Sequence, residues 1–103
     1  MYRVTTPTHI FTLPNDTSAY SVIQISYKQK KVELVKQYEN GTCPSGMTLD
    51  EKDVIIVLTQ EETKAFKGGI VQSQVRVLTN GGNAYASQMF NISINDVINE
   101  EIL

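Results

Sequence analysis

Residues Ile70–Thr79 read I-V-Q-S-Q-V-R-V-L-T, and this stretch decides the fold class. Apolar or small side chains recur at every second position, and polar side chains fill most positions between them. A period of two is typical of an antiparallel strand with one face buried and the other in water. The buried face is predicted to carry Val71, Ser73, Val75 and Val77, and the solvent face Gln72, Gln74 and Arg76.

The residues that follow predict a hairpin. The turn Asn80-Gly81-Gly82-Asn83 is rich in residues that tolerate positive φ, which tight hairpin turns require. The partner strand is predicted over Ala84–Asn95, with one face made of Ala84, Ala86, Phe90, Ile92 and Ile94.

Five further segments are predicted to be strands. Thr8–Leu13 lies between two prolines, as expected of an edge strand. The apolar run Asp53–Thr59 is expected to be central in its sheet or covered on both faces. The other three are Tyr20–Gln29, Val32–Tyr38 and a short strand around Met47 and Leu49.

One short helix is predicted before the hairpin. Thr59 and Glu62 have the spacing of a capping box, in which Thr is the N-cap and Glu lies three residues later. Gly68 and Gly69 end the helix soon afterwards. Phe66 is predicted to fill the core beneath it.

The composition agrees with a β protein. Ile, Val and Thr contribute ten residues each, so 30 of the 103 residues are β-branched and favour strands. We predict one domain over residues 1–103, with residues 96–103 as a C-terminal tail. Its fold class is predicted to be all-β: an immunoglobulin-like antiparallel β-sandwich of about seven strands, with one short helical turn near residues 60–66. The paired Cys and the Trp typical of immunoglobulin domains are missing, so the chain would be a divergent relative of them. A small open barrel is the alternative.

The charge balance argues against several classes of partner. Nine Lys and Arg against eleven Asp and Glu give a net charge of -2, whereas nucleic-acid binders usually carry a basic excess. Lys28, Lys30 and Lys31 form the one basic cluster, which we interpret as the tip of a hairpin. No stretch approaches the ~18 apolar residues of a membrane span, and the N-terminus lacks a signal-peptide pattern. We therefore expect no nucleic acid or membrane among the partners, and synthesis in a cytoplasm.

The residues that carry catalysis are few. His9 and Cys43 are the only His and Cys, and we interpret them as an exposed histidine and a loop cysteine rather than a nucleophilic pair. Asp50, Glu51 and Asp53 match no calcium loop and read as a solvated loop. We therefore predict no catalytic residue, no cofactor and no metal, and a protein that is not an enzyme.

Two surfaces are candidate interfaces. The outward row of the central strand, Gln72, Gln74 and Arg76, is polar but low in charge. The C-terminal tail is unusually apolar for a chain end, which is normally polar. Its apolar residues are expected to dock either on their own domain or on a neighbour, and they are Val97, Ile98, Ile102 and Leu103.

The order of motifs resembles a family of small proteins encoded by tailed phages and prophages. The most specific element is L-T-Q-E-E-T-K-A-F at Leu58–Phe66, followed by glycines and by Q-V-R-V-L at Gln74–Leu78. Thr17–Gln29, Gly82–Ser87 and the ending N-E-E-I-L continue it. Together they resemble the N-terminal domain of the phage baseplate upper protein. The resemblance implies an immunoglobulin-like virion module, made in the bacterial host cytoplasm, that docks to tail or baseplate proteins and has no catalytic residues.

Two main functions therefore stay open, with a small enzyme as the least favoured third. The favoured one is a structural protein of a phage tail or baseplate that assembles with itself or with other subunits. The alternative is a stand-alone binding module that recognises carbohydrate or a host surface. Sugar binding usually needs exposed aromatic side chains, and those available for it are Tyr2, Tyr20, Tyr38 and Tyr85.

Overall fold

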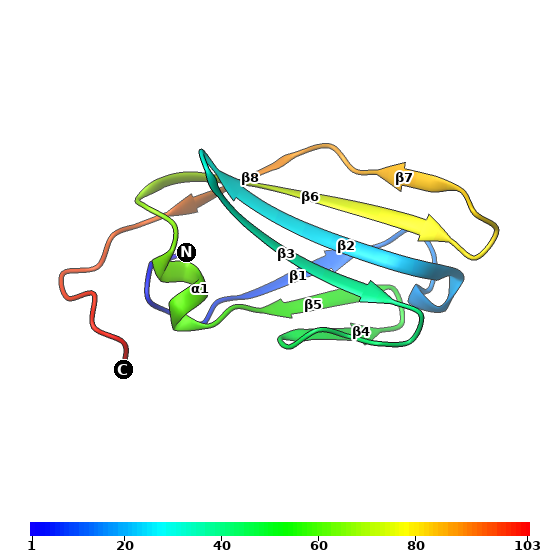
Figure 1. The fold of residues 1–103 in the computed structure, drawn as a ribbon, viewed down its shortest axis with the longest axis horizontal. Coiled ribbons are helices and arrows are strands. Elements are labelled where there is room, and N and C mark those ends of the chain that lie inside the picture. The colour runs from blue at the N-terminus through cyan, green and yellow to red at the C-terminus, as the bar shows by residue number, and fades with distance from the viewer.

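Eight strands form two antiparallel sheets that pack face to face in the computed structural model, which describes residues 1–103 (Figure 1). The strands are β1 Thr8–Thr12, β2 Tyr20–Gln29, β3 Val32–Glu39, β4 Met47–Asp50, β5 Asp53–Val57, β6 Gly69–Thr79, β7 Ala84–Ala86 and β8 Phe90–Ile94. The small sheet has the order β1-β5-β4. The large sheet has the order β3-β2-β6-β7, and β8 also pairs with β6. The predicted immunoglobulin-like β-sandwich is confirmed, with eight strands rather than about seven.

The core lies between the two sheets. On β2, the alternate residues Ile23, Ile25 and Tyr27 are fully buried. Val54 and Ile56 meet them from β5, and Val71 and Val75 from β6. Because each strand buries every second side chain, the period of two in the sequence predicts the core face of the long strands.

The small sheet confirms two expectations about its strands. β1 lies at an edge and pairs only with β5, and β5 is central. The apolar run of β5 is covered on one face only, because Val54 and Ile56 point into the core while Val57 is exposed. Ile10 of β1 shares that outer face and is also exposed.

Two short helical segments connect the strands. One is the 3-10 turn Thr17–Ala19, and the other is α1, Gln60–Lys64, as predicted. The capping box is confirmed: the Thr59 hydroxyl accepts from the Glu62 N–H at 3.1 Å, and the Thr59 N–H donates to the Glu62 carboxylate at 2.8 Å. Phe66 follows α1 and is fully buried, also as predicted. Neither segment is long and apolar enough to cross a membrane.

The partner strand of the hairpin departs from the prediction. Instead of one strand over Ala84–Asn95, the chain forms β7 and β8 with an extra residue between them. Arg76 pairs with Ala86, but Ser73, three residues earlier, pairs with Phe90, four residues later. One inserted residue exchanges the two faces of a strand. The five predicted residues therefore do not share a face.

The exchange of faces has a direct effect on the side chains. Tyr85 pairs with Val77 and so faces the core side of β7, while Ala84 and Ala86 face solvent. On β8, Phe90 and Ile92 face the core side. The sequence pattern does not reveal this insertion, because the small residues Ala84 and Ala86 fit either face.

Candidate functional site

An apolar groove of about 810 Å³ runs along the open side of the sandwich. One wall is β1, with Ile10 and Phe11, and the other is β6 and β7, with Val77 and Tyr85. Phe90 extends the second wall, and its ring centroid lies 6.2 Å from that of Phe11. The two sheets meet here only partly, so large apolar side chains stay in contact with water.

The groove exists because β1 and β7 are both sheet edges. The N-terminal segment covers the edge of β8 at Asn95, where its N–H donates to the Met1 carbonyl at 2.7 Å and its carbonyl accepts from the Arg3 N–H at 2.9 Å. No strand continues this cover along β7. As a result Tyr85 is 61% exposed, and Ile10, on the outer face at the β1 edge, is 62% exposed. Exposed apolar side chains gathered in one groove are typical of an interaction site.

The sequence pattern does not predict this groove. Its aromatic member Tyr85 faces the groove only because of the extra residue between β7 and β8. Of the four tyrosines available for sugar binding, Tyr2 and Tyr85 are exposed, whereas Tyr38 is half-buried and Tyr20 is buried in the core.

The predicted row on β6 lies on the opposite face of the large sheet. Gln72 and Arg76 are exposed there, as the alternation predicts. Gln74 is half-buried, because its amide donates to the Ser87 carbonyl at 2.8 Å. Its hydrogen-bonding capacity is therefore partly used inside the chain. The row does not join the groove.

The C-terminal tail lies beyond the end of the sandwich, next to α1 (Figure 1). Its contacts with the domain are polar: the Leu103 N–H donates to the Gln60 side chain at 2.7 Å, and the Gln60 amide donates to the Leu103 carbonyl at 3.1 Å. The side chains of Ile98 and Leu103 are fully exposed, and Ile102 is partly so. Only Val97 is half-buried.

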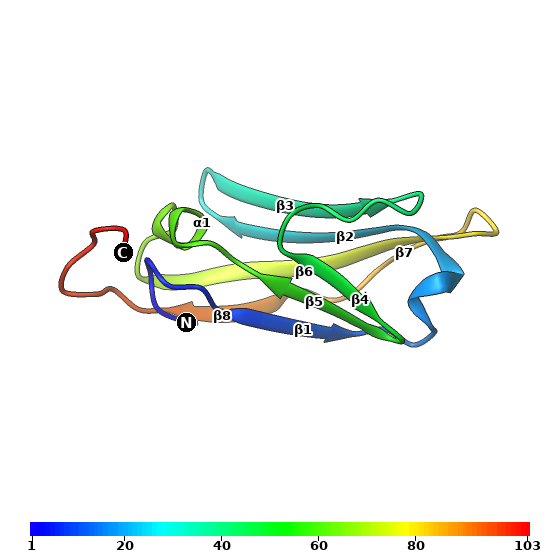
Figure 2. The same ribbon diagram turned by 90° about the horizontal axis from the view of Figure 1, so that it is seen from below.

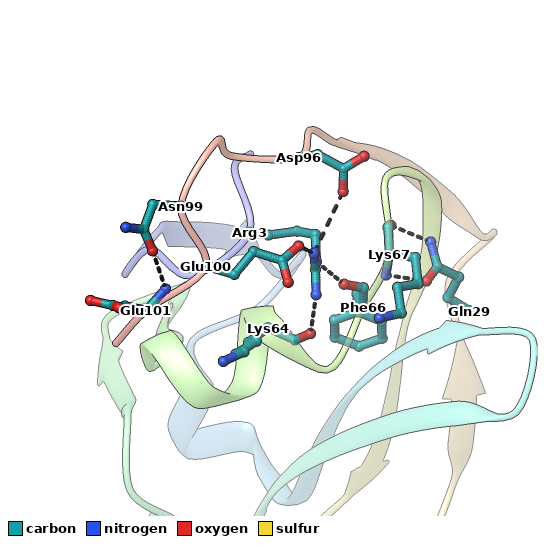
Figure 3. A network of polar contacts seen from close by, with 9 residues as sticks. All are labelled: Arg3, Gln29, Lys64, Phe66, Lys67, Asp96, Asn99, Glu100 and Glu101. Atoms are coloured by element: carbon teal, nitrogen blue, oxygen red, sulfur yellow. Dashed lines mark hydrogen bonds and ion pairs between the residues drawn. The ribbon is translucent and has the colours of Figure 1, made fainter. Parts of the chain in front are cut away.

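Arg3 holds this end of the molecule together (Figure 3). Its guanidinium donates to the carbonyls of Phe66 at 2.5 Å and Lys64 at 2.8 Å, which are left free where α1 ends. It also pairs with Glu100 of the tail, and lies 3.6 Å from Asp96. Arg3 is 2% exposed, and its forked donors satisfy several acceptors at once. No pattern in the sequence marked this residue.

Other ionisable side chains lie inside the sandwich. His9 faces inward and is half-buried, which corrects the expectation of an exposed histidine. Its Nδ1 lies 2.9 Å from the hydroxyl of Tyr27. Burial and then the amino terminus lower the pKa of His9, and burial, with a smaller effect of Glu62, raises that of Tyr27. Cys43 is instead exposed between β3 and β4.

The acidic residues after β4 do not converge on a site. The Asp53 carboxylate accepts from the hydroxyl of Thr12 at 2.7 Å. Glu51 has a positive φ in the turn between β4 and β5. No group of three or more His, Cys, Asp or Glu side chains lies close enough together to hold a metal ion.

The fold and its surfaces define an immunoglobulin-like sandwich with one open, apolar side. Comparison of the chain with protein-family models, curated proteins and solved structures finds no match.

Proposed function

We propose that this chain is a non-enzymatic structural module of a tailed phage or prophage particle, which works by protein–protein docking in the tail or baseplate. The order of motifs from Thr17 to Leu103 supports the phage assignment through its resemblance to the baseplate upper protein. It would be made in the host cytoplasm and end in the virion.

The observation that carries the docking function is the groove between β1 and β7. Its lining includes Ile10, Tyr85 and Phe90, three large side chains that are 41–62% exposed. Burial of apolar surface of this kind is the main driving force of protein association. The free edge of β1 adds backbone donors and acceptors beside the same groove.

Particle composition tests the proposal. Particles purified from a strain that carries the gene should contain the chain in a fixed ratio to the major tail protein, measured by quantitative mass spectrometry. Tyr85→Lys places a charge in the groove and should remove the chain from particles. Val35→Lys, at an exposed position on the opposite face of the large sheet, is the matched control and should be incorporated. Absence of the wild-type chain from particles would contradict the proposal.

The alternative is a stand-alone module that binds carbohydrate or a host surface. The exposed ring of Tyr85 in the groove is the observation in its favour, since sugars stack on aromatic faces. A glycan array distinguishes the two functions. Specific glycan binding that Tyr85→Ala abolishes, together with absence from particles, would favour the alternative.

A further inference from the structure

The free edges of the two sheets are not equally protected against pairing. β3 carries Glu33 and Glu39, and β4 has four residues and ends at Asp50. β7 is three residues long, and the N-terminal segment covers the end of β8 through bonds to Ser93 and Asn95. Charges, short strands and covering segments are the usual means of preventing edge-to-edge association. β1 has five residues, T-H-I-F-T, with no Lys, Arg, Asp, Glu or Pro among them.

Alternate residues of β1 point their backbone N–H and C=O groups toward β5, and the residues between them point these groups to solvent. The Leu13 N–H donates to the Lys52 carbonyl at 2.8 Å, and the Pro7 carbonyl accepts from the Leu58 N–H at 3.1 Å. Hydrogen bonding alternates along an antiparallel strand, so residues 7, 9, 11 and 13 bond toward β5. The N–H and C=O groups of Thr8, Ile10 and Thr12 therefore point away from β5 to the open edge.

The edge formed by these three residues is complementary to the same edge of a second copy. In an antiparallel pair centred on Ile10, Thr8 of one copy lies opposite Thr12 of the other, and Ile10 lies opposite Ile10. Thr–Thr and apolar cross-strand pairs both stabilise sheets, and no like charges meet. A two-fold contact needs such a self-complementary patch. We propose that two copies of this chain pair antiparallel along β1, so that their small sheets join into one six-stranded sheet.

The groove is continuous with this edge. Figure 2 shows β1 of the small sheet and β8 of the large sheet along the same margin of the molecule. A two-fold axis perpendicular to the sheets places the two open sides against each other. Phe11, Tyr85 and Phe90 of each copy are then covered by the other copy. The same association therefore satisfies the free backbone groups of β1 and buries the apolar groove.

This inference rests on the proposed docking function and names its first partner, a second copy. Light scattering over a range of concentrations should find a dimer for the purified chain. Ile10→Lys sets two ammonium groups opposite each other at the two-fold axis and should give a monomer. Ile70→Lys is the matched control, because Ile70 is 50% exposed on β6, and it should remain dimeric. Circular dichroism should show that both variants are folded, since both side chains are exposed.

A cross-link tests the register. Opposed residues in a hydrogen-bonded antiparallel pair have Cα atoms about 5.5 Å apart, within the range that a disulfide bridges. Ile10→Cys, made with Cys43→Ser so that it is the only thiol, should therefore form an intermolecular disulfide on mild oxidation. Ile70→Cys with Cys43→Ser should form it much more slowly. Equal rates, or an Ile10→Lys protein that is still dimeric, would overturn the proposed pairing.

The two proposals fail in different ways. A wild-type chain that is monomeric at every concentration but is incorporated into particles overturns the β1 dimer and leaves the docking function standing, with another subunit on the groove. A chain that forms the Ile10 cross-link but is absent from particles supports the dimer and overturns the phage role.

Discussion

The side-chain nitrogen of Lys36 lies 2.7 Å from a carboxylate oxygen of Glu62, and this ion pair joins β3 of the large sheet to the first turn of α1. The same nitrogen donates to the Ser45 carbonyl at 2.9 Å, in the connection before β4. Both side chains are largely buried. Burial by itself would raise the pKa of Glu62, but hydrogen bonds from Lys36 and from the Thr59 N–H outweigh it and hold that pKa below its ordinary value.

Lys36→Met should lower the free energy of unfolding by about 2 kcal/mol, because the carboxylate of Glu62 then loses its charged hydrogen-bond donor. Glu62→Gln keeps an oxygen that can cap the Thr59 N–H, so its loss should be smaller. Urea unfolding of both single variants and of the double variant measures the coupling. The double variant should lose less than the sum of the singles, and a strictly additive result would contradict direct pairing.

His9 predicts a pH dependence of stability. Its folded-state pKa lies below the ordinary 6.5, so the unfolded chain takes up a proton at a higher pH than the folded chain does. This contribution is fully present above that pH and is lost as the pH falls through the folded-state pKa. His9→Gln keeps a polar group beside Tyr27 but does not titrate. Between about pH 7 and pH 5, the wild type should lose more stability than the variant in denaturant titrations. Parallel curves would contradict this.

Gly46 and Gly41 form a matched pair of positive-φ positions. Their φ values are 81° and 88°, so alanine is strained at either one. A Cβ at Gly41 meets nothing within 4 Å, but a Cβ at Gly46 would lie 2.5 Å from the Val57 carbonyl oxygen. Gly41→Ala should therefore cost about 1 kcal/mol, from backbone strain alone. Gly46→Ala should cost roughly 2 kcal/mol more, because β5 must shift. Equal melting temperatures for the two variants would argue against the close contact.

Much of the fold could be predicted because its long strands bury one face each. The alternation in Tyr20–Gln29 places Ile23, Ile25 and Tyr27 in the core without any knowledge of the partner strands. The start of α1 could also be predicted, because a capping box is a local interaction between Thr59 and Glu62. In each case the sequence pattern and the interaction that produces it lie within one short segment of the chain.

The groove and the Arg3 contacts could not be predicted, because each depends on residues far apart in the chain. Tyr85 faces the groove only because β6 pairs with β7 and with β8 in registers that differ by one residue. The buried side chain of Arg3 donates to carbonyl groups that lie 61 and 63 residues later in the sequence. The alternation of β3 places Lys36 on the same face as Val32 and Leu34, but it does not reveal the partner Glu62. Such long-range pairing leaves no periodic pattern.

Arg3 should be hard to replace. Arg3→Lys keeps the charge but leaves one ammonium group to satisfy the Phe66 and Lys64 carbonyls together with Glu100. We expect a loss of about 2 kcal/mol in the free energy of unfolding, because a buried acceptor then lacks its donor. Asn80→Ala is a suitable control, since it also removes a long-range hydrogen bond, from its amide to Ser18, but at an exposed site. A loss at Arg3 no larger than at Asn80 would contradict the anchoring role.

The tail tests whether its apolar side chains serve this domain or a neighbour. Ile98 and Leu103 are fully exposed, so Ile98→Ser with Leu103→Ser should change the free energy of unfolding by less than about 0.5 kcal/mol. Glu100→Gln weakens the tie to Arg3 and should increase amide exchange in residues 97–103, measured by mass spectrometry. If the serine variant unfolds much more easily, the apolar side chains pack on their own domain. If it stays stable but is no longer incorporated into particles, they pack on a neighbour, as their exposure predicts.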